Sequence, residues 1–417
     1  MPDPDLSGET RARFWKIAGA GASFQAGSTA VDSATVVASL VYQLTGSALA
    51  VGAASAVLRL GWLLPQFAVG YLAQSARKTM PFYVFGAYGR AIVAGLIGIL
   101  LWFGDQVPPV WLAAAFLALW TCYAFVSGVV AVPYNDIVGR SIPSNARSRM
   151  LAYRFFGGGV LALGIAGFAR SMLENGPLLR GYAMIFWLAS LLMILSSTLF
   201  VSAGEPGQSK VDDRRKGANG LKNFVKGGFG ILKDDARFRL FLFSQWLGGA
   251  TLMALPFYMV AALKRGITAG DVGLLMGAQT IGALLSNPIW GRIGDAAGKL
   301  RLMQVVGVLR VLLPLAVLVL LAGGAGRLAF AALFLAIGAM MNGVTIGYLG
   351  FLMEISPDDR RPAYSAYFNT LAAPAALLPL LGAGFVNLIS LPAVFVAAMA
   401  AAVCQFVLLL RISKEMA

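Results

Sequence analysis

The sequence has 417 residues, of which 59% are hydrophobic and only 12% are charged, and its mean hydropathy is +0.76. Soluble domains carry about 25% charged residues, so this chain could not cover the surface of a soluble fold of its size. The net charge of +15 would suggest nucleic-acid binding in a soluble protein. Here most Lys and Arg residues lie in short loops between apolar stretches, where they set membrane orientation. Composition therefore predicts an integral membrane protein and no nucleic-acid partner.

Histidine is absent, and the two cysteines, Cys122 and Cys404, lie in apolar stretches. These facts exclude a His-based proton relay, a His-ligated metal and a Ser/His/Asp triad, and they support no disulfide framework. No Gly-x-x-x-x-Gly-Lys-[Ser/Thr] loop for nucleotides is present. We therefore expect no metal, no cofactor and no enzymatic activity. The acidic start of the chain is unlike a signal peptide, so we expect the first apolar stretch to remain as a span.

Apolar stretches of about 20 residues, long enough to cross a bilayer, recur twelve times along the chain. The first six are predicted at residues 16–41, 49–73, 81–103, 111–134, 151–173 and 181–202. The second six are predicted at residues 240–263, 272–291, 302–321, 328–352, 364–388 and 393–410. The fold class is therefore an all-α integral membrane protein with 12 transmembrane helices.

The placement of Lys and Arg predicts the orientation of these spans. If both termini are cytoplasmic, the opposite loops hold only Arg170, Arg180, Lys264, Arg265 and Arg327 out of 33 basic residues. Cytoplasmic loops carry an excess of Lys and Arg, so both termini are expected in the cytoplasm and the protein in the cytoplasmic (inner) membrane.

The only long loop lies between the sixth and seventh spans. It is rich in charged residues and glycine and predicts a linker at 203–239 between a bundle at 1–202 and a bundle at 240–417. Within it, apolar residues recur at roughly helical spacing at Leu221, Val225, Phe229 and Leu232. This pattern indicates an amphipathic helix on the cytoplasmic membrane surface, and a flexible linker is the alternative.

The two halves of the sequence repeat each other. At an offset of 220 or 221 residues the matches are Val51-Gly52 with Val272-Gly273, Gly70 with Gly291, and Arg90 with Arg310. At an offset of 214 they are Tyr134 with Tyr348, Pro143 with Pro357, Arg147 with Arg361, and Ala152-Tyr153 with Ala366-Tyr367. Six spans repeated in the same orientation predict two halves related by a pseudo-twofold axis along the membrane normal.

A short loop motif follows the second span and is echoed after the eighth. The second copy, residues 291–299, reads GRIGDAAGK, and the first, residues 70–78, reads GYLAQSARK with Gln74 in place of the acidic residue. In this motif and in its duplication the whole chain resembles the major facilitator superfamily. The resemblance implies two six-helix bundles and a cytoplasmic latch at Gly70, Gln74, Arg77, Gly291, Asp295, Gly298 and Lys299. Arg147 and Arg361, beside Pro143 and Pro357, are interpreted as loop anchors on the same side.

The segment Val132-Pro133-Tyr134, with Ile142-Pro143 and Arg147, is similar to the sugar–cation symporter branch of that superfamily. That branch uses acidic residues of the second span for its cation. The second span of this chain has no acidic residue, so the resemblance implies neither a sugar substrate nor that cation site.

Asp32 is the only acidic residue deep within a predicted span. It belongs to a polar stripe with spacings of three and four, which predicts one helical face made of Gln25, Ser28, Asp32, Thr35 and Ser39. A polar face on a spanning helix avoids lipid. In the family that the chain resembles, spans one, four, seven and ten line the central cavity, so we expect the stripe to face that cavity.

Arg59 is the expected partner of Asp32. Counted from the cytoplasmic ends of their spans at 1.5 Å per residue, both residues lie about 23 Å into the membrane. We hypothesise that Asp32 pairs with Arg59 and that a proton or the substrate competes for the pair. A permanent structural salt bridge is the alternative, because charges within a membrane usually neutralise one another.

Other polar and aromatic residues of spans four, seven and ten are candidates to line an aromatic, nearly neutral substrate cavity together with Gln25, Ser28 and Thr35. They are Trp120, Tyr123, Ser127, Gln245, Thr251, Tyr258, Asn342, Thr345 and Tyr348. Each of them could instead serve helix packing. Arg90 and Arg310, on spans three and nine, are interpreted as structural residues near the cytoplasmic latch.

These patterns predict a monomeric secondary transporter that moves a small molecule by alternating access, with the proton as coupling ion and Asp32 as its carrier. Three alternatives remain open. The protein could be an uncoupled facilitator or lipid flippase, a membrane sensor without transport activity, or a membrane enzyme. The absence of His and the scarcity of deep acidic residues argue against the enzyme.

Overall fold

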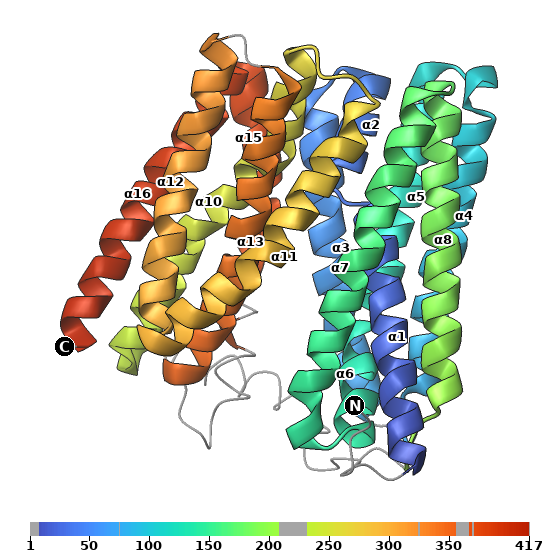
Figure 1. Cartoon of the computed structure of the whole chain (residues 1–417), viewed down its shortest axis with the longest axis vertical. Coiled ribbons are helices and arrows are strands. Elements are labelled where there is room, and N and C mark those ends of the chain that lie inside the picture. The colour runs from blue at the N-terminus through green and yellow to red at the C-terminus, as the bar shows by residue number, and fades with distance from the viewer. Residues whose placement is uncertain are drawn as a thin grey trace. The chain divides into compact units, whose positions relative to one another are not determined.

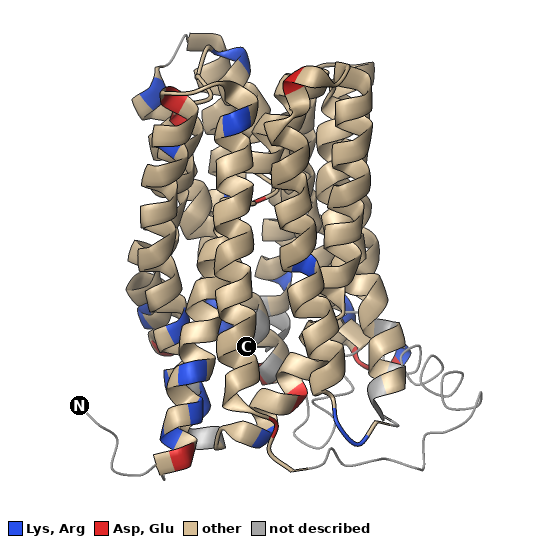
Figure 2. Cartoon of the chain, turned by 90° about the vertical axis from the view of Figure 1, so that its right-hand side faces the viewer, with Lys and Arg blue, Asp and Glu red and all other residues tan. Residues whose placement is uncertain are grey.

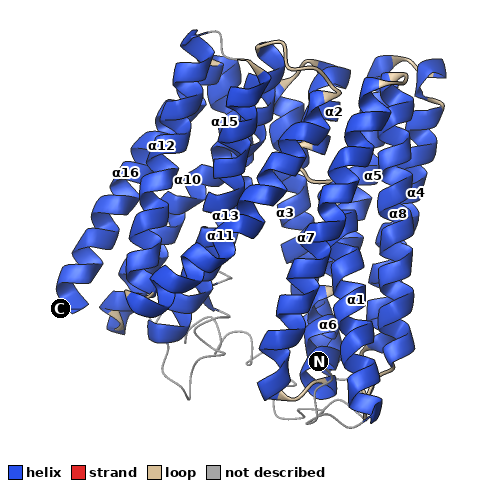
Figure 3. Cartoon of the chain, in the orientation of Figure 1, coloured by secondary structure: helices blue, strands red, loops and turns tan. Residues whose placement is uncertain are grey.

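The computed structural model describes residues 8–74, 76–207, 232–323, 326–355, 367–368 and 371–416. This part of the chain contains helices and no strand (Figure 3). The first helices are α1 (Gly8–Ala30), α2 (Val36–Thr45), α3 (Ala48–Gln74), α4 (Met80–Trp102), the 3-10 helix η1 (Gly104–Gln106), α5 (Pro109–Gly128), α6 (Ala131–Ser141), α7 (Ser144–Glu174) and α8 (Leu178–Ala203). They are followed by α10 (Ala236–Lys264), α11 (Asp271–Ala296), α12 (Lys299–Gly323), α13 (Arg327–Ile355), the 3-10 helix η3 (Ala373–Leu377), α15 (Leu378–Leu388) and α16 (Leu391–Met416).

The predicted all-helical membrane fold is confirmed. Among the described residues, ten helical stretches are long and apolar enough to cross a membrane. The first and eleventh predicted spans are instead built from shorter pieces, namely α1 with α2 and η3 with α15. Figure 2 shows Lys and Arg gathered near the ends of the helices, with few along their middle parts. This distribution fits helices whose central turns lie in hydrocarbon.

Two spans that the sequence predicts as continuous helices are interrupted. The first breaks between Ala30 and Val36, where the Asp32 side chain accepts hydrogen bonds from backbone N–H groups. The fourth breaks between α5 and α6, where Val129 and Val130 donate to carbonyls three residues back rather than four. Pro133 follows this second break, and its missing N–H leaves the carbonyl of Val129 without the usual helical bond. The spacing of hydrophobic residues, from which both spans were predicted, does not reveal either interruption.

The structure divides by contacts into two compact units. Unit 1 comprises residues 1–46, 57–213 and 268–277, and unit 2 comprises residues 47–56, 214–267 and 278–417. Residues 208–231 of the predicted linker at 203–239, which include Leu221, Val225 and Phe229 of the predicted amphipathic helix, lie outside the described residues. The domain boundaries at 202 and 239 stay a prediction.

In unit 1, α1 packs against α7 and α8, and α4 packs against α8 and α5 (Figure 1). Its core cluster includes Tyr83 and Phe200, whose rings stack 4.1 Å apart. Serine hydroxyls of α8 add hydrogen bonds between helices: Ser196 donates to the carbonyl of Ala20, and Ser190 donates to the carbonyl of Ala91. Such bonds hold helices together where lipid supplies no hydrophobic force between them.

In unit 2, α16 packs against α10 and α12, α12 packs against α13, and α10 packs against α15. The core cluster at one end of these helices combines aliphatic residues with four phenylalanines, Phe238, Phe241, Phe351 and Phe368. A buried arginine of α12, Arg310, donates a 2.5 Å hydrogen bond to the side chain of Gln405 on α16. Arg310 therefore bonds a neighbouring helix rather than the cytoplasmic latch.

Glycines bring the second and fourth helices of each sequence repeat into close contact. In unit 1, a Cβ added at Gly61 of α3 would lie 2.6 Å from the Cβ of Ala124 on α5. In unit 2, a Cβ added at Gly282 of α11 would overlap the carbonyl of Leu335, and one at Gly338 of α13 would overlap the carbonyl of Gln279. Gly61 and Gly282 are equivalent at an offset of 221. The repeated contact supports the duplication predicted from sequence.

We expect Gly338→Ala to destabilise the protein by about 1–3 kcal/mol, because the new methyl group has no space between α13 and α11. Thermal unfolding of the purified protein, followed by tryptophan fluorescence, measures the effect. The matched control is Gly384→Ala on α15, where an added Cβ meets nothing within 4 Å. Equal melting temperatures for the two variants would contradict the close contact.

Candidate transport site

One face of α1 is polar and incompletely covered. Its half-buried side chains are Phe24, Gln25, Ser28 and Thr29, whereas the residues between them are buried against α7 and α8. Ser28 and Thr29 turn their hydroxyls back to the carbonyl of Gln25, each at 2.9 Å. Polar side chains on an open face of a spanning helix favour a water-filled cavity over lipid.

Asp32 lies at the break between α1 and α2, where it is half-buried. Its Oδ1 accepts hydrogen bonds from the backbone N–H groups of Ala34 and Thr35, at 3.1 and 3.0 Å, and from the Thr35 hydroxyl at 2.9 Å. The carboxylate thus caps the turn that leads into α2, because it accepts from N–H groups two and three residues further along the chain, as a helix cap does. Its negative charge also faces the positive end of that helix.

Arg59 of α3 is close enough to Asp32 for the two charges to attract each other, but they form no direct ion pair. The Nε atom of Arg59 is buried and has no hydrogen-bond partner. The direct contact between Asp32 and Arg59 that both sequence hypotheses assume, the exchangeable pair and the permanent salt bridge, is therefore not formed in this structure.

The polar stripe of span one does not form a single helical face. Because α1 ends at Ala30, Thr35 lies in the break directly before α2 and Ser39 belongs to α2, and both are fully buried. Ser39 accepts a 2.8 Å hydrogen bond from the hydroxyl of Tyr182 on α8, and Gln43 joins the same group. The predicted continuity of this stripe was wrong because the Asp32 cap ends the helix.

The predicted residues of span four lie in an aromatic layer of unit 1. The ring of Trp120 stacks on Tyr123 at 5.0 Å and lies near Phe116 and Phe186, and its side chain is fully buried. Tyr123 and Ser127 are also buried. This layer belongs to the packed interior in this structure, and a role in substrate contact stays a prediction.

The predicted residues of unit 2 occupy varied surroundings. Tyr258 is buried against Phe395, Thr251 is buried, and Gln245 is half-buried. Asn342 of α13 donates to the carbonyl of Ala283 at 3.0 Å and to the side chain of Asn287 at 2.9 Å, which ties α13 to α11.

Two further candidates follow on α13. Thr345 is exposed and bonds the carbonyl of Met341 within its own helix. Tyr348 packs its ring against Phe241 and Phe368. The structure does not gather the candidates of unit 2 into one site.

The latch residues lie at helix ends. Lys299 bonds Asp295 at 3.1 Å, and the intervening Gly298 has φ +83°, which only glycine adopts readily. Arg147 donates to the carbonyls of Ile142 and Gly139 and so anchors its loop.

Of the other latch positions, a Cβ at Gly70 or Gly291 would meet nothing within 4 Å, and Arg77 is exposed. The side chain of Gln74 and all of Arg361 lie outside the described residues.

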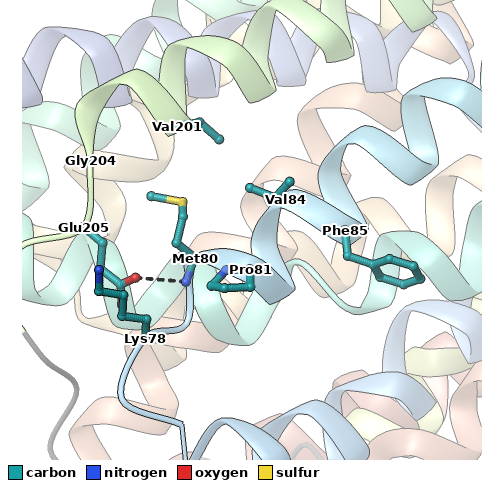
Figure 4. Close-up of a pocket in the computed structure, with 8 residues that line it drawn as sticks. All are labelled: Lys78, Met80, Pro81, Val84, Phe85, Val201, Gly204 and Glu205. Carbon is teal, nitrogen blue, oxygen red and sulfur yellow. Dashed lines mark hydrogen bonds between the residues drawn. The ribbon is translucent and has the colours of Figure 1, made fainter.

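A charge network that the sequence analysis missed connects α4, α6 and the end of α8. Arg140 forms ion pairs with Asp136 at 2.5 Å and with Glu205 at 2.6 Å. Glu205 also accepts hydrogen bonds from the backbone N–H groups of Thr79 and Met80, the second of which is drawn in Figure 4. The signal in the sequence was the i, i+4 spacing of Asp136 and Arg140. Glu205 could not be found because its partners are distant along the chain.

This network lies at the first turn of α4, beside an open groove of about 580 Å³ between Lys78 and Val201 (Figure 4). Partial burial alone would raise the pKa of Glu205. The hydrogen bonds from Arg140, Thr79 and Met80 outweigh this effect and hold the pKa below its ordinary value. Glu205 therefore stays charged at neutral pH and fixes the segment after α8 to the start of α4.

The fold is that of a multi-pass membrane protein whose helices carry a polar, charged face. The family model described as MFS/sugar transport protein matches residues 24–358. The chain therefore belongs to this family, and the resemblance to the major facilitator superfamily is confirmed. Transporters of this kind act on small molecules across a membrane.

Solved structures share the fold. A mutant of the nucleoside transporter NupG has a TM-score of 0.70 at 13% identity and covers 96% of this chain and 99% of its own. A bacterial homologue of the iron transporter ferroportin, in an inward-facing state, has a TM-score of 0.72 at 12% identity and covers 96% and 98%.

Proteins described as uncharacterized, from Mycobacterium bovis and Mycobacterium tuberculosis, are 22% identical over 322 residues, which are 75% of this chain. The match spans 62% of these relatives, less than two thirds of their length.

We expect Asp32→Ala to lower stability by about 1 kcal/mol because the cap of α2 is lost. Asp32→Asn should keep most of this stability, since the amide oxygen can accept the same backbone bonds. Thermal unfolding of both variants at pH 7 measures the difference. If Asp32→Ala melts at the wild-type temperature, the carboxylate does not cap α2.

We expect Glu205→Gln to cost about 1–3 kcal/mol at pH 7, since a charged acceptor loses its ion pair. The folded-state pKa of Glu205 lies below its unfolded value of about 4.3, so its stabilisation is present above that pH and is lost as the pH falls through the folded-state pKa. The melting temperatures of wild type and variant should therefore converge as the pH falls through the lowered folded-state pKa. Glu9→Gln, at an exposed side chain, is the control and should show no such difference. A gap between wild type and Glu205→Gln that does not narrow as the pH is lowered through the acidic range would contradict this account.

Proposed function

We propose that this protein is a secondary active transporter that moves a small molecule across the cytoplasmic membrane by alternating access, coupled to protons through Asp32. The observation that carries the proposal is the position of this carboxylate. It lies in the break of the first span, next to a polar helix face and within electrostatic reach of Arg59. A carboxylate in such surroundings is costly to keep charged, so a change in its surroundings can drive it to take up or release a proton.

Residues 1–202 and 240–417 would form the two bundles that rock about the substrate, with the linker and both termini in the cytoplasm. The exposed loops around Gly291 and Lys299 would latch the cytoplasmic side in one state. We further propose that the protein works as a monomer, since each half supplies its own packed core.

The comparisons support transport but leave the cargo open. The family description refers to sugars, one structural neighbour carries nucleosides, and another is a homologue of an iron transporter. Cargo therefore differs among proteins of this fold, and it depends on the side chains of the site. Among the described residues, no group of three or more His, Cys, Asp or Glu side chains could hold a metal ion.

The test uses proteoliposomes that contain the full chain and a pH-sensitive dye in their lumen. Sugars, nucleosides and organic anions are added outside as separate concentration gradients. We expect at least one class of compound to change the lumenal pH in the wild type. Asp32→Asn, which keeps the cap of α2, should abolish this pH change, whereas Asp105→Asn, at an exposed loop residue, should retain it.

Other outcomes identify the rival functions. Uptake of a compound without a pH change, equal in wild type and Asp32→Asn, would indicate an uncoupled facilitator. Movement of a fluorescent lipid between leaflets in place of soluble compounds would indicate a flippase. Ligand binding without any flux would indicate a sensor.

A further inference from the structure

Arg154 of α7 lies directly on α1 at Gly21, where an added Cβ would overlap the arginine side chain. Its Nη1 donates a 2.8 Å hydrogen bond to the hydroxyl of Tyr134, and its guanidinium lies 5.2 Å from the centre of the Tyr134 ring. The Nε atom is buried without a partner. Among the described residues, no carboxylate lies within ion-pair distance of Arg154.

A second arginine that forms no ion pair with a carboxylate of the described residues lies nearby. Arg90 of α4 is only 4% exposed, its guanidinium lies 4.0 Å above the ring of Phe24 on α1, and its Nε atom has no partner. It is close enough to Arg154 for the two positive charges to repel each other. A cation–π contact contributes about 2 kcal/mol when desolvated, whereas burial of a charge costs several kcal/mol. The ring alone does not compensate this charge.

The second half of the sequence repeat shows which residues fill the equivalent positions when only packing is required. The equivalents of Gly21, Tyr134 and Arg154 in the second half are Phe241, Tyr348 and Phe368, at offsets of 220, 214 and 214. In unit 2 these three rings pack against one another, with centroid separations of 4.8 to 5.7 Å.

In unit 1, one phenylalanine is replaced by an arginine and the other by the glycine that makes room for it. Three aromatic rings are sufficient for packing at these positions, so the charge of Arg154 has a role other than packing.

The position of Gly21 along α1 places Arg154 on the proposed transport path. Gly21 is five residues beyond Lys16, whose ammonium bonds the carbonyl of Ser202 near the end of α8. It is nine residues before Ala30, the last residue of α1, which corresponds to about 14 Å along the helix, and Asp32 lies just beyond that end. Arg154 and Arg90 therefore lie between the end of the bundle and Asp32, next to the half-buried polar face of α1.

We propose that Arg154, with Tyr134 and Arg90, binds the anionic group of the transported substrate, a carboxylate or a phosphate. This inference rests on the proposed function and narrows its substrate to organic anions. It replaces the nearly neutral cavity expected from sequence. A guanidinium presents two parallel N–H groups to such an anion, and the Tyr134 hydroxyl holds this fork in position. The anion supplies the negative charge that both arginines lack.

Thermal shift of the purified full chain tests the proposal with two matched pairs of probes at constant ionic strength. Glycerol 3-phosphate is compared with glycerol for a soluble anion, and citrate is added as a tricarboxylate. Lysophosphatidic acid is compared with a monoacylglycerol for a lipid headgroup. A ligand that binds only the folded protein raises the melting temperature. We expect at least one anion, but neither neutral probe, to stabilise the wild type.

The variants separate charge from packing. Arg154→Phe should weaken the apparent affinity for the stabilising anion about 10- to 100-fold, the factor for one charge-assisted hydrogen bond. If this variant is poorly folded, Gly21→Phe combined with Arg154→Phe restores the aromatic trio of unit 2 and should show the same loss. Arg154→Lys keeps the charge without the fork and should fall between. The control is Arg327→Gln, an exposed arginine at the start of α13, which should bind like the wild type.

Each outcome either supports or overturns the proposed anion site. Stabilisation by the soluble anions or by the lysophospholipid, lost in both Phe variants, supports the site and identifies the source of the anion. No stabilisation by any anionic probe, or equal stabilisation in wild type and the Phe variants, overturns it. Because this binding needs no proton gradient, a failure of proton coupling leaves the result untouched. Conversely, absent anion binding would not contradict coupled flux of another compound.

Discussion

The cost of a charge inside hydrocarbon controls the arrangement of unit 1. Removing an ion from water costs several kcal/mol even after the protein relaxes, so each charged side chain in a span needs compensation. Asp32 obtains it from backbone N–H groups at the start of α2, and Arg154 obtains part of it from the Tyr134 hydroxyl. Arg90 and Arg59 obtain less, because an aromatic ring and a distant carboxylate are weak partners. Unit 1 therefore has more positive than negative charge within its spans.

The broken first span and the charge of Asp32 are one feature. The N–H groups that bond the carboxylate are available because they lie in the break Val31–Thr35, between the two helices. The carboxylate in turn favours the break, because it offers the backbone hydrogen bonds that compete with those of a continuous helix. A continuous helix would use those N–H groups for its own hydrogen bonds and leave Asp32 in hydrocarbon with Arg59 alone. The break thus makes an isolated acidic residue tolerable at this depth.

The features that depend on hydrophobicity and on the sequence duplication could be predicted from the sequence. Span length, the repeat and the family follow from apolar runs and from matched residues such as Gly70 and Gly291. The prediction failed at Asp32, where periodicity assumes a continuous helix and cannot register a side chain that bonds its own backbone. Glu205 was missed because its bonds to Arg140 and Thr79 join segments far apart in the chain.

The role proposed for Arg154 was missed in the sequence for a different reason. The repeat matched its neighbours Ala152 and Tyr153 with Ala366 and Tyr367, and the mismatch with Phe368 two residues further along was the informative position. A search for similarity passes over such a position, whereas a search for charge that only one half carries would find it.

The two halves agree in packing and differ in charge. Gly61 and Gly282 make equivalent close contacts, because helices can approach only where both backbones lack bulk. By contrast, the equivalents of Asp32, Arg59 and Arg154 are Leu252, Thr280 and Phe368. A duplicated fold must keep the contacts that both copies need, whereas a charge in hydrocarbon is kept only where it has a use. Unit 2 packs its helices without these three charges, so packing of the shared fold does not require Arg59 or Arg154, whereas Asp32 also bonds the backbone of the turn that leads into α2. The binding and coupling that we propose would therefore depend on the first half of the chain.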